Sequence, residues 1–247
     1  MKQAVILAAG QGSRLTHASN GVPKCLLKVG GTPLIEHQLR ILEEVGIERV
    51  CVVVGHDART VRSAASSRCE FIVNHQYAST NSLYSLWLAR EWVSGPFVLM
   101  NCDVLAHPDI YHRVMAVNGS ALAYDSASGE EDEHMKVCLK GGLVRSLGKQ
   151  LPREMVDGEN VGVLQFDEAA ARLLFVEARE IIDSGTTCDW APAAVDRLAK
   201  RIPIRAIDVS DLPWTEIDFP DDLHSAEHSI WPLIETGRWV KPERLAS

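Results

Sequence analysis

The first part of the chain alternates short apolar runs with amphipathic stretches. The apolar runs predict buried strands, because continuous apolar segments are typical of strands that are covered on both faces. They span residues 4–9, 50–54, 71–73 and 97–100. Between them, residues 34–45 have helical spacing that ends at Gly46, and further helices are expected from Asp57 to about residue 67 and from residue 80. This alternation predicts right-handed crossovers and a mostly parallel sheet.

The second part of the chain has a different pattern. Apolar runs at 121–124 and 161–166 predict strands, and two runs around Lys140-Gly141-Gly142 predict a hairpin of residues 135–139 and 143–147. The polar, acidic stretch 126–133 between them is typical of a loop. Helices are expected over 168–184, from Asp189 to about 200 and from Pro220, with a strand at 204–209 and an extended segment at 214–218. This half is expected to form an antiparallel extension.

These elements predict an α/β fold, Rossmann-like, with a mostly parallel mixed sheet flanked by helices and a small antiparallel extension. We expect one domain over residues 1–237 and a C-terminal tail at 238–247. The length of 247 residues and the 46% hydrophobic and 23% charged content suit a globular domain of this kind. The sequence contains neither a membrane-spanning segment nor a signal peptide pattern, so a cytoplasmic location is expected.

Composition narrows the classes of partner. The net charge of −8 argues against a broad nucleic-acid interface. The six cysteines and nine histidines lack the short spacings of a zinc site.

A glycine-rich stretch follows the first predicted strand. It contains Gly10 and Gly12, and the cations Arg14 and Lys24 come after them. Glycines permit close approach of the backbone to a ligand, and successive N–H groups in such a loop can hold an anion. A plain turn between strand and helix explains the glycines equally well, because the stretch matches neither the dinucleotide fingerprint nor the Walker A pattern.

Two aspartates follow extended segments. Asp103 comes after the run 97–100, and Asp218 ends Glu216-Ile217-Asp218. Ligands of α/β folds bind at the carboxyl ends of the strands, and two carboxylates there could share a Mg²⁺ ion. Taken singly, each aspartate also fits the start of a loop or helix. Lys149 is likewise either a phosphate-binding cation or a surface lysine after a hairpin.

The motif from Leu7 to Leu15, the later Pro23-Lys24, and Gly31-Thr32-Pro33-Leu34-Ile35 together resemble the nucleotidyltransferase superfamily. The resemblance implies a triphosphate-binding loop, with Lys24 at the α-phosphate and Arg14 at the leaving pyrophosphate. It also implies that Asp103 and Asp218 hold Mg²⁺ as the cofactor. The loop residues that it assigns to the nucleotide are Leu7, Ala8, Ala9, Gly10, Gly12 and Ser13.

Further segments are similar to the bacterial phosphocholine and phosphonate cytidylyltransferases. They are Asn81 to Trp87, Met135-Lys136-Val137, Gly148-Lys149, Asp157 to Val163 and Trp214 to Asp218. This resemblance implies that Lys149 approaches the acceptor phosphate and that Asn81 and Ser82 line the base, where a helix N-terminus would offer N–H donors. The residues expected to bind the acceptor are Lys136, Glu159, Gly162 and Trp214.

Residues near the expected acceptor site bear on which kind of ammonium group the acceptor carries. Choline-using members have an aromatic cage, but the matching positions here hold Thr215 and His134. Glu130, Glu131, Asp132 and Glu133 favour a primary ammonium instead, as in 2-aminoethylphosphonate. The spacing of Trp87, Trp92 and Trp190 fits core positions on helices.

We therefore predict a Mg²⁺-dependent cytidylyltransferase that uses CTP and a small phosphorylated or phosphonate acceptor and releases pyrophosphate. No nucleic acid or membrane partner is expected, and a homodimer is possible. Two alternatives remain: a sugar-1-phosphate nucleotidyltransferase on the same scaffold, and a non-catalytic nucleotide-binding regulator that has kept the fold.

Overall fold

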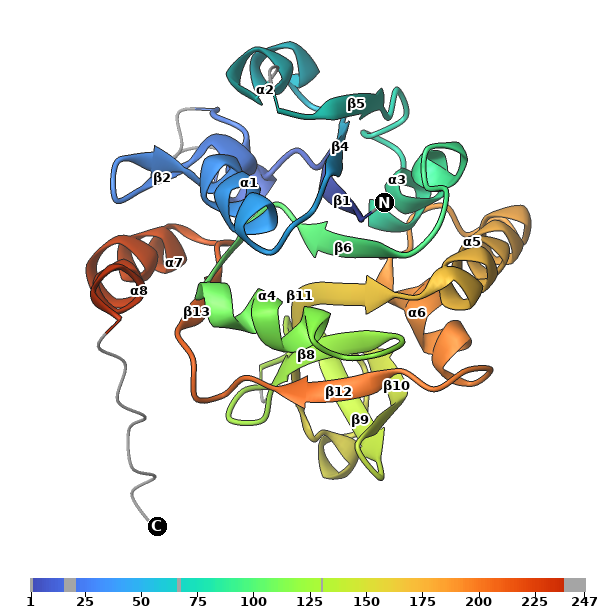
Figure 1. The fold of residues 1–247 in the computed structure, drawn as a ribbon. Coiled ribbons are helices and arrows are strands. Elements are labelled where there is room, and N and C mark those ends of the chain that lie inside the picture. The colour runs from blue at the N-terminus through green and yellow to red at the C-terminus, as the bar shows by residue number, and fades with distance from the viewer. Residues whose placement is uncertain (1, 16–20, 66–67, 130, 238–247) are drawn as a thin grey trace.

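The computed structural model describes residues 2–15, 21–65, 68–129 and 131–237, and within these ranges nine strands form one twisted sheet (Figure 1). The order of the strands is β5-β4-β1-β6-β11-β8-β12-β10-β9. Their bounds are β1 (Gln3–Ala8), β4 (Arg49–Val54), β5 (Glu70–Val73), β6 (Phe97–Asn101), β8 (Ala121–Asp125), β9 (Lys136–Lys140), β10 (Leu143–Gly148), β11 (Gly158–Phe166) and β12 (Arg205–Asp208).

The strands of the first half are parallel and aligned at their carboxyl ends. Strand β1 lies between β4 and β6, with Ala8 opposite Val54 and Leu7 opposite Asn101. All six residues of β1 are buried, which agrees with the continuous apolar run in the sequence. The segments that follow β1, β4 and β6 therefore leave the sheet at the same edge, where α/β folds bind their ligands.

The strands of the second half extend the same sheet, mostly by antiparallel pairing, as predicted. Strand β11 runs antiparallel to both β6 and β8, and β12 lies parallel to β8. Strand β9 also pairs back with β11, through Gly158 opposite Val137. The strands β11, β8, β12, β10 and β9 thus form a closed ring of pairings at one end of the sheet. The α/β fold with a mixed sheet is confirmed, with parallel pairing concentrated in the first half.

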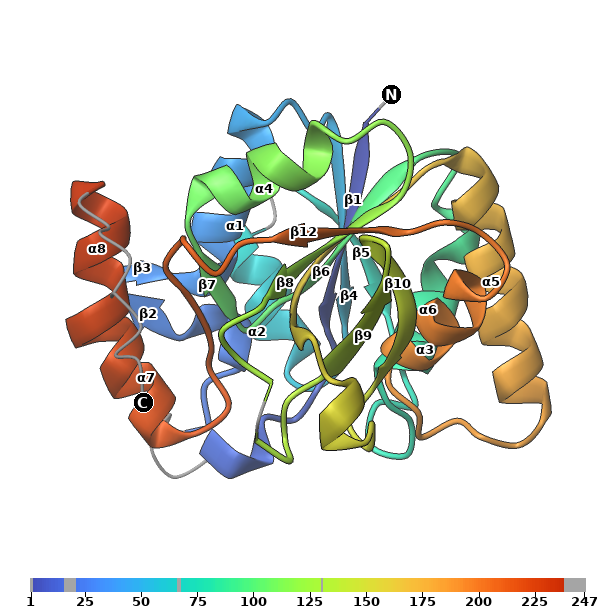
Figure 2. The same cartoon turned by 90° about the horizontal axis from the view of Figure 1, so that it is seen from below.

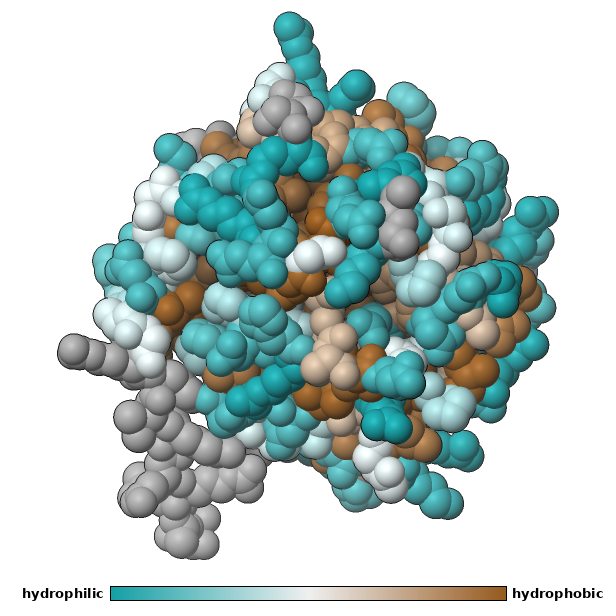
Figure 3. Space-filling model, in the orientation of Figure 1, coloured by the Kyte–Doolittle hydropathy of each residue, from teal (hydrophilic) through white to brown (hydrophobic). Residues whose placement is uncertain are grey.

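Helices cover both faces of the sheet (Figure 2). On one face, α1 (Leu34–Glu44), α2 (Ala58–Ala65) and α4 (Pro108–Met115) contribute to one hydrophobic cluster. On the other, α3 (Ser82–Leu88), α5 (Glu168–Asp183) and α6 (Pro192–Ala199) contribute to a second. The face of the molecule shown in Figure 3 is mainly hydrophilic, with apolar residues visible between the polar ones.

The C-terminal helices form a third, smaller unit. Helix α7 (Pro220–Ser225), a π-helix (Ala226–Ile230) and α8 (Trp231–Thr236) lie against the hairpin of β2 (Lys28–Val29) and β3 (Thr32–Pro33). Glu227 accepts a hydrogen bond of 2.9 Å from the backbone N–H of Gly30, and the Trp231 ring lies 4.6 Å from the ring of His37. This unit links the end of the chain to the segment that follows Lys24.

Several elements differ from the sequence predictions, and the short strands β2, β3 and β7 (Val104–Ala106) are among those that were not predicted. Helix α4 was not predicted; its N-cap is His107, whose Nδ1 accepts from the N–H of Asp109 at 3.1 Å, and histidine is not among the usual cap residues. Helix α6 begins at Pro192 rather than at Asp189. The predicted tail at 238–247 lies outside the described residues. None of the helices in the described part of the chain has the length and apolar character needed to cross a membrane.

Gly30 and Gly31 offer a matched pair for testing the C-terminal unit. Both have positive φ, but a Cβ on Gly30 would overlap the Trp231 indole, whereas one on Gly31 would meet no atom within 4 Å. Gly31→Ala is expected to cost about 1 kcal/mol from backbone strain alone. Gly30→Ala is expected to cost about 3 kcal/mol, since overpacking adds to the strain. Urea unfolding measures the free energy of unfolding of both variants. Equal losses of this free energy would contradict the contact between Gly30 and Trp231.

Candidate active site

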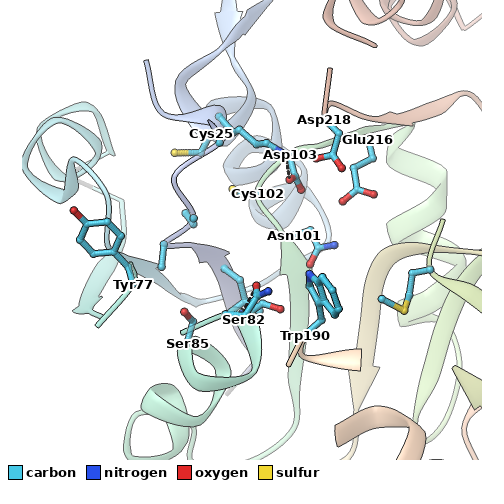
Figure 4. Close-up of a pocket in the computed structure, with 18 of the residues that line it drawn as sticks. Cys25, Tyr77, Ser82, Ser85, Asn101, Cys102, Asp103, Trp190, Glu216 and Asp218 are labelled. Atoms are coloured by element: carbon cyan, nitrogen blue, oxygen red, sulfur yellow. Dashed lines mark hydrogen bonds and ion pairs between the residues drawn. The ribbon is translucent and has the colours of Figure 1, made fainter. Parts of the chain in front are cut away.

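A pocket of about 320 Å³ opens at the carboxyl edge of β1 and β6 (Figure 4). Its walls come from segments far apart in the sequence: the glycine-rich loop, the start of α3, the end of β6, the acidic loop before β9, and the strand near the C-terminus. The predicted site residues that line it are Leu7, Ala8, Ala9, Gly10, Gly12, Ser13, Arg14, Lys24, Asn81, Ser82, Asp103, Lys149 and Asp218. The fold therefore brings the expected nucleotide, cation and metal residues together.

Three carboxylates meet at one end of the pocket. Ligand oxygens of Asp103, Glu216 and Asp218 lie within 4.8 Å of one another, and the three side chains point toward a common space in Figure 4. Strand β13 (Trp214–Glu216) pairs with β7 (Val104–Ala106), and the N–H of Ile217 donates to the carbonyl of Asp103 at 3.0 Å. Backbone pairing thus sets the distance between carboxylates that are more than a hundred positions apart in sequence.

Gln38 of α1 supports the turn that carries Asp103. Its buried Nε2 donates to the carbonyls of Asn101 and Val104, at 2.8 and 3.0 Å. These bonds satisfy two backbone acceptors on either side of Asp103, and so fix the direction in which this carboxylate leaves the sheet.

Lys24 lies between two of the carboxylates. Its Nζ is 3.0 Å from Asp103 Oδ2 and also contacts Asp218 Oδ1. Burial disfavours the charged ammonium, but the two carboxylates outweigh this cost and raise the pKa of Lys24 above its ordinary value. Gly12 adopts positive φ and places its backbone against the Lys24 side chain, where a Cβ would lie 3.1 Å from Cγ.

A second pair of cations stands at the mouth of the pocket. Arg14 and Lys149 both donate to Glu133 Oε2, at 2.9 and 3.0 Å. Arg14 also reaches Asp218 Oδ2 at 3.4 Å. Lys149 and Arg14 lower the pKa of Glu133 below its usual range through these contacts. Lys149 is therefore a pocket residue rather than a peripheral surface lysine.

The opposite end of the pocket combines the glycine loop with the start of α3. Asn81 caps this helix: its Oδ1 accepts from the N–H of Ser82 at 2.8 Å. The N–H of Leu83 donates to the carbonyl of Asp189, and Ser82 Oγ accepts from the N–H of Ala191. These backbone donors are engaged within the protein, so the expectation that they serve a pyrimidine carbonyl is not supported. The Asn81 and Ser82 side chains remain on the pocket wall.

None of the four predicted acceptor residues lines the pocket. Lys136 is buried and donates to the carbonyl of Lys149 at 2.8 Å, so it holds the residue that does reach the pocket. Glu159 is buried beneath the acidic loop and accepts from Ser128 Oγ, and burial raises its pKa. Trp214 donates through Nε1 to Asp125 at 2.9 Å.

Gly162 has a packing role instead. It lies where the β11–β8 register shifts and has a φ of +80°, and a Cβ there would lie 2.9 Å from Asn101 Nδ2. The glycine lets β11 approach the end of β6 closely.

Several pocket residues were not predicted. They are Glu216, Asn101, Asn160, Met135 and Trp190, whereas Glu133, which also lines the pocket, belongs to the acidic group that was expected to meet an ammonium. Glu216 could have been predicted from the sequence, because residues two apart in an extended segment share a face and Asp218 was already expected to bind the metal. Trp190 was expected in the core, but it is 46% exposed and its ring lies 5.0 Å from Lys149 Nζ. The helical spacing around it was misleading, because Trp190 precedes α6.

The carboxylate cluster fits a divalent cation. Burial, and then the charges of Asp103 and Asp218, raise the pKa of Glu216 well above its ordinary value. Lys24 supplies one positive charge to this group of three acids, and a hard cation with a preference for oxygen ligands would supply the remainder. The donor set is therefore the chemistry that Mg²⁺ takes, with Asp103, Glu216 and Asp218 as the residues that would hold it.

Comparison with known proteins identifies the family. The profile of the MobA-like NTP transferase domain matches residues 4–165, so the chain belongs to this family and is an enzyme of the nucleotidyltransferase kind. The predicted superfamily is thereby confirmed.

Individual relatives share nearly the whole chain. It is 32% identical to the CMP-5'-(3-aminopropyl)phosphonate synthase of Streptomyces rubellomurinus, over 96% of its own length and 40% of the relative's. It is 28% identical to the bifunctional IPC transferase and DIPP synthase of Aquifex aeolicus, over 92% and 51%. The chain thus spans about half or less of these curated relatives.

A solved structure of the CTP:phosphocholine cytidylyltransferase of Streptococcus pneumoniae has the same fold. Its TM-score is 0.74 at 22% identity, and the match covers 92% of this chain and 97% of that one.

Glu216→Gln is expected to stabilise the metal-free protein at alkaline pH. Because the pKa of Glu216 is raised by folding, the wild type loses stability as pH rises from about 4.3 through the folded pKa. The amide removes this loss. In urea unfolding without divalent cations, the free energy of unfolding of the variant should exceed that of the wild type by about 1 kcal/mol at pH 8, and by less at pH 5. Glu154→Gln, at an exposed position, controls for the charge change. A gap that does not change with pH would contradict the assignment.

Proposed function

We propose that the protein transfers a cytidylyl group from CTP to a small phosphonate or phosphate monoester, with Mg²⁺ as cofactor and pyrophosphate as the second product. The convergence of Asp103, Glu216 and Asp218 with the cations Lys24, Arg14 and Lys149 in one pocket carries this proposal. The choice of a cytidine nucleotide is supported by the relative that is named for a CMP-linked phosphonate.

The reaction is an in-line displacement at the α-phosphorus of CTP. An oxygen of the acceptor phosphonate or phosphate forms a bond to the α-phosphorus, and the bond from that phosphorus to the bridging oxygen of the β-phosphate breaks. The electron pair leaves with pyrophosphate. Such a reaction depends on positioning and neutralisation of charge more than on a protein nucleophile. Bound Mg²⁺ supplies charge neutralisation at the reacting phosphates.

The cations of the pocket have separate tasks in this proposal. Lys24 leaves its carboxylate partners to contact the α-phosphate, and Arg14, next to Asp218, neutralises the departing pyrophosphate. Lys149 binds the phosphonate or phosphate group of the acceptor. The hydrogen bond from Lys136 Nζ to the backbone carbonyl of Lys149 holds Lys149 in position. The glycine-rich loop holds the triphosphate between them, because its backbone lines the same pocket as these side chains.

Incubation with each of four nucleoside triphosphates, Mg²⁺ and a panel of acceptors tests the proposal. The panel contains alkylphosphonates, phosphate monoesters and sugar 1-phosphates. We expect pyrophosphate release with CTP and a phosphonate or phosphate monoester. Release with a sugar 1-phosphate alone would instead support the sugar-nucleotide alternative.

Asp103→Asn is expected to lower kcat about 10³-fold, because the amide cannot supply the charge that the reacting phosphates and their cation require. The amide weakens the ion pair with Lys24 but also removes the repulsion from Glu216 and Asp218, so the unfolding midpoint in urea should move little. Asp109→Asn, a surface change on α4, serves as the control and should keep full activity. An Asp103→Asn variant with wild-type turnover would refute the metal assignment.

A further inference from the structure

Glu133 occupies an unusual position for a residue of an exposed acidic loop. One of its oxygens, Oε2, accepts hydrogen bonds from both Arg14 and Lys149, at 2.9 and 3.0 Å. Arg14 in turn reaches Asp218 at 3.4 Å, so one guanidinium separates Glu133 from the carboxylate cluster. Among the acidic residues 131–133 described in this loop, Glu133 is the one that lines the pocket.

The loop that carries Glu133 is attached to the sheet at both ends. Asp125 at its start accepts from the N–H of Ala127 at 2.8 Å and from Trp214 Nε1 at 2.9 Å. At its end, His134 Nδ1 accepts from the N–H of Gly129 at 3.2 Å. Gly129 packs against the backbone of Gly158 so closely that a Cβ would lie 2.8 Å from it. These contacts hold the loop on either side of Glu133, whose side chain is 48% exposed and lies at the rim of the pocket.

The ion pairs of Glu133 impose a charge condition on any acceptor. A phosphonate that binds Lys149 must replace the Glu133 carboxylate there. The displaced carboxylate then faces a dianion across a short distance, and like charges in close contact repel. An acceptor that also carries a positive group removes this repulsion, since its cation can take the place of the lysine beside Glu133.

We propose that Glu133 determines specificity for a zwitterionic acceptor, by binding a primary ammonium group on the substrate whose phosphonate or phosphate binds Lys149. This inference rests on the proposed function and assigns the acceptor's second charged group to one residue. When such an acceptor binds, its anionic group pairs with Lys149 and its ammonium group pairs with Glu133. Neither of these two residues is then left without an opposite charge.

The aromatic residues of the pocket favour a primary over a quaternary ammonium. Quaternary groups are recognised by several aromatic faces around the cation. Tyr77 and Trp190 are the aromatic residues on the described pocket wall, and in Figure 4 Tyr77 lies at the end away from the carboxylates. Trp190 already faces Lys149 Nζ at 5.0 Å. A carboxylate that accepts hydrogen bonds from an N–H donor suits a primary amine, which has three N–H donors.

The test compares acceptors that differ only in the amine. Cytidylyl transfer is measured with 2-aminoethylphosphonate and with ethylphosphonate, for the wild type and for Glu133→Gln. We expect the variant to lower kcat/KM for the amino acceptor about 30-fold, mainly through KM, because a charged hydrogen bond is lost. For ethylphosphonate, kcat/KM should stay the same or rise, since the competing carboxylate has gone.

Two further variants sharpen the result. Glu154→Gln makes the same charge change at an exposed position outside the pocket and should leave the ratio of the two kcat/KM values unchanged. Glu133→Asp keeps the carboxylate and should recover part of the preference. If Glu133→Gln lowers kcat/KM equally for both acceptors, or leaves their ratio unchanged, the inference is wrong while the proposed function stands. If the wild type uses neither of these two acceptors but releases pyrophosphate with another phosphonate or phosphate monoester, the inference is wrong while the proposed function stands; only failure with every phosphonate and phosphate monoester overturns both.

Discussion

The ion pairs of Lys24 with Asp103 and Asp218 are the interaction on which the site depends. They join the loop after β1, the turn after β6 and the C-terminal segment through one ammonium group. Three carboxylates within 4.8 Å of one another would repel strongly without a cation among them. Lys24 therefore allows this arrangement to form before any substrate or metal binds, and the proposed reaction exchanges its partners for phosphate oxygens.

The rest of the fold holds these three segments in place. The pairing of β13 with β7 brings Glu216 beside the turn that carries Asp103. Gln38 fixes that turn through its hydrogen bonds to the carbonyls of Asn101 and Val104. The C-terminal helices lie against the β2–β3 hairpin, which follows Lys24 closely in the chain. The same pattern of paired charge recurs at the pocket mouth, where Glu133 holds Arg14 and Lys149. In the proposed reaction, these carboxylates keep Lys24, Arg14 and Lys149 paired until a substrate anion replaces them.

The sequence predicted the half of the site that depends on one strand and its loop. The apolar run of β1 and the glycines after it placed the nucleotide loop, and the run of β6 placed Asp103. Of the residues predicted to bind the acceptor, Lys136 and Glu159 do not line the pocket, whereas their chain neighbours Met135 and Asn160 do. Adjacent residues of a strand face opposite sides, so a one-residue error exchanges pocket and interior. The closed ring through β9 and β11, a long-range pairing, left no local signal.

Phosphorus NMR of a mixture of CTP, Mg²⁺, 2-aminoethylphosphonate and the protein is the most direct test of the proposed cytidylyl transfer, because it follows the bonds that form and break. The proposed transfer gives a new pair of coupled resonances, from the phosphonate phosphorus and the former α-phosphorus joined through one oxygen, together with an equal amount of free pyrophosphate. Consumption of CTP without a resonance in which the acceptor's phosphorus is coupled to the α-phosphorus would contradict it.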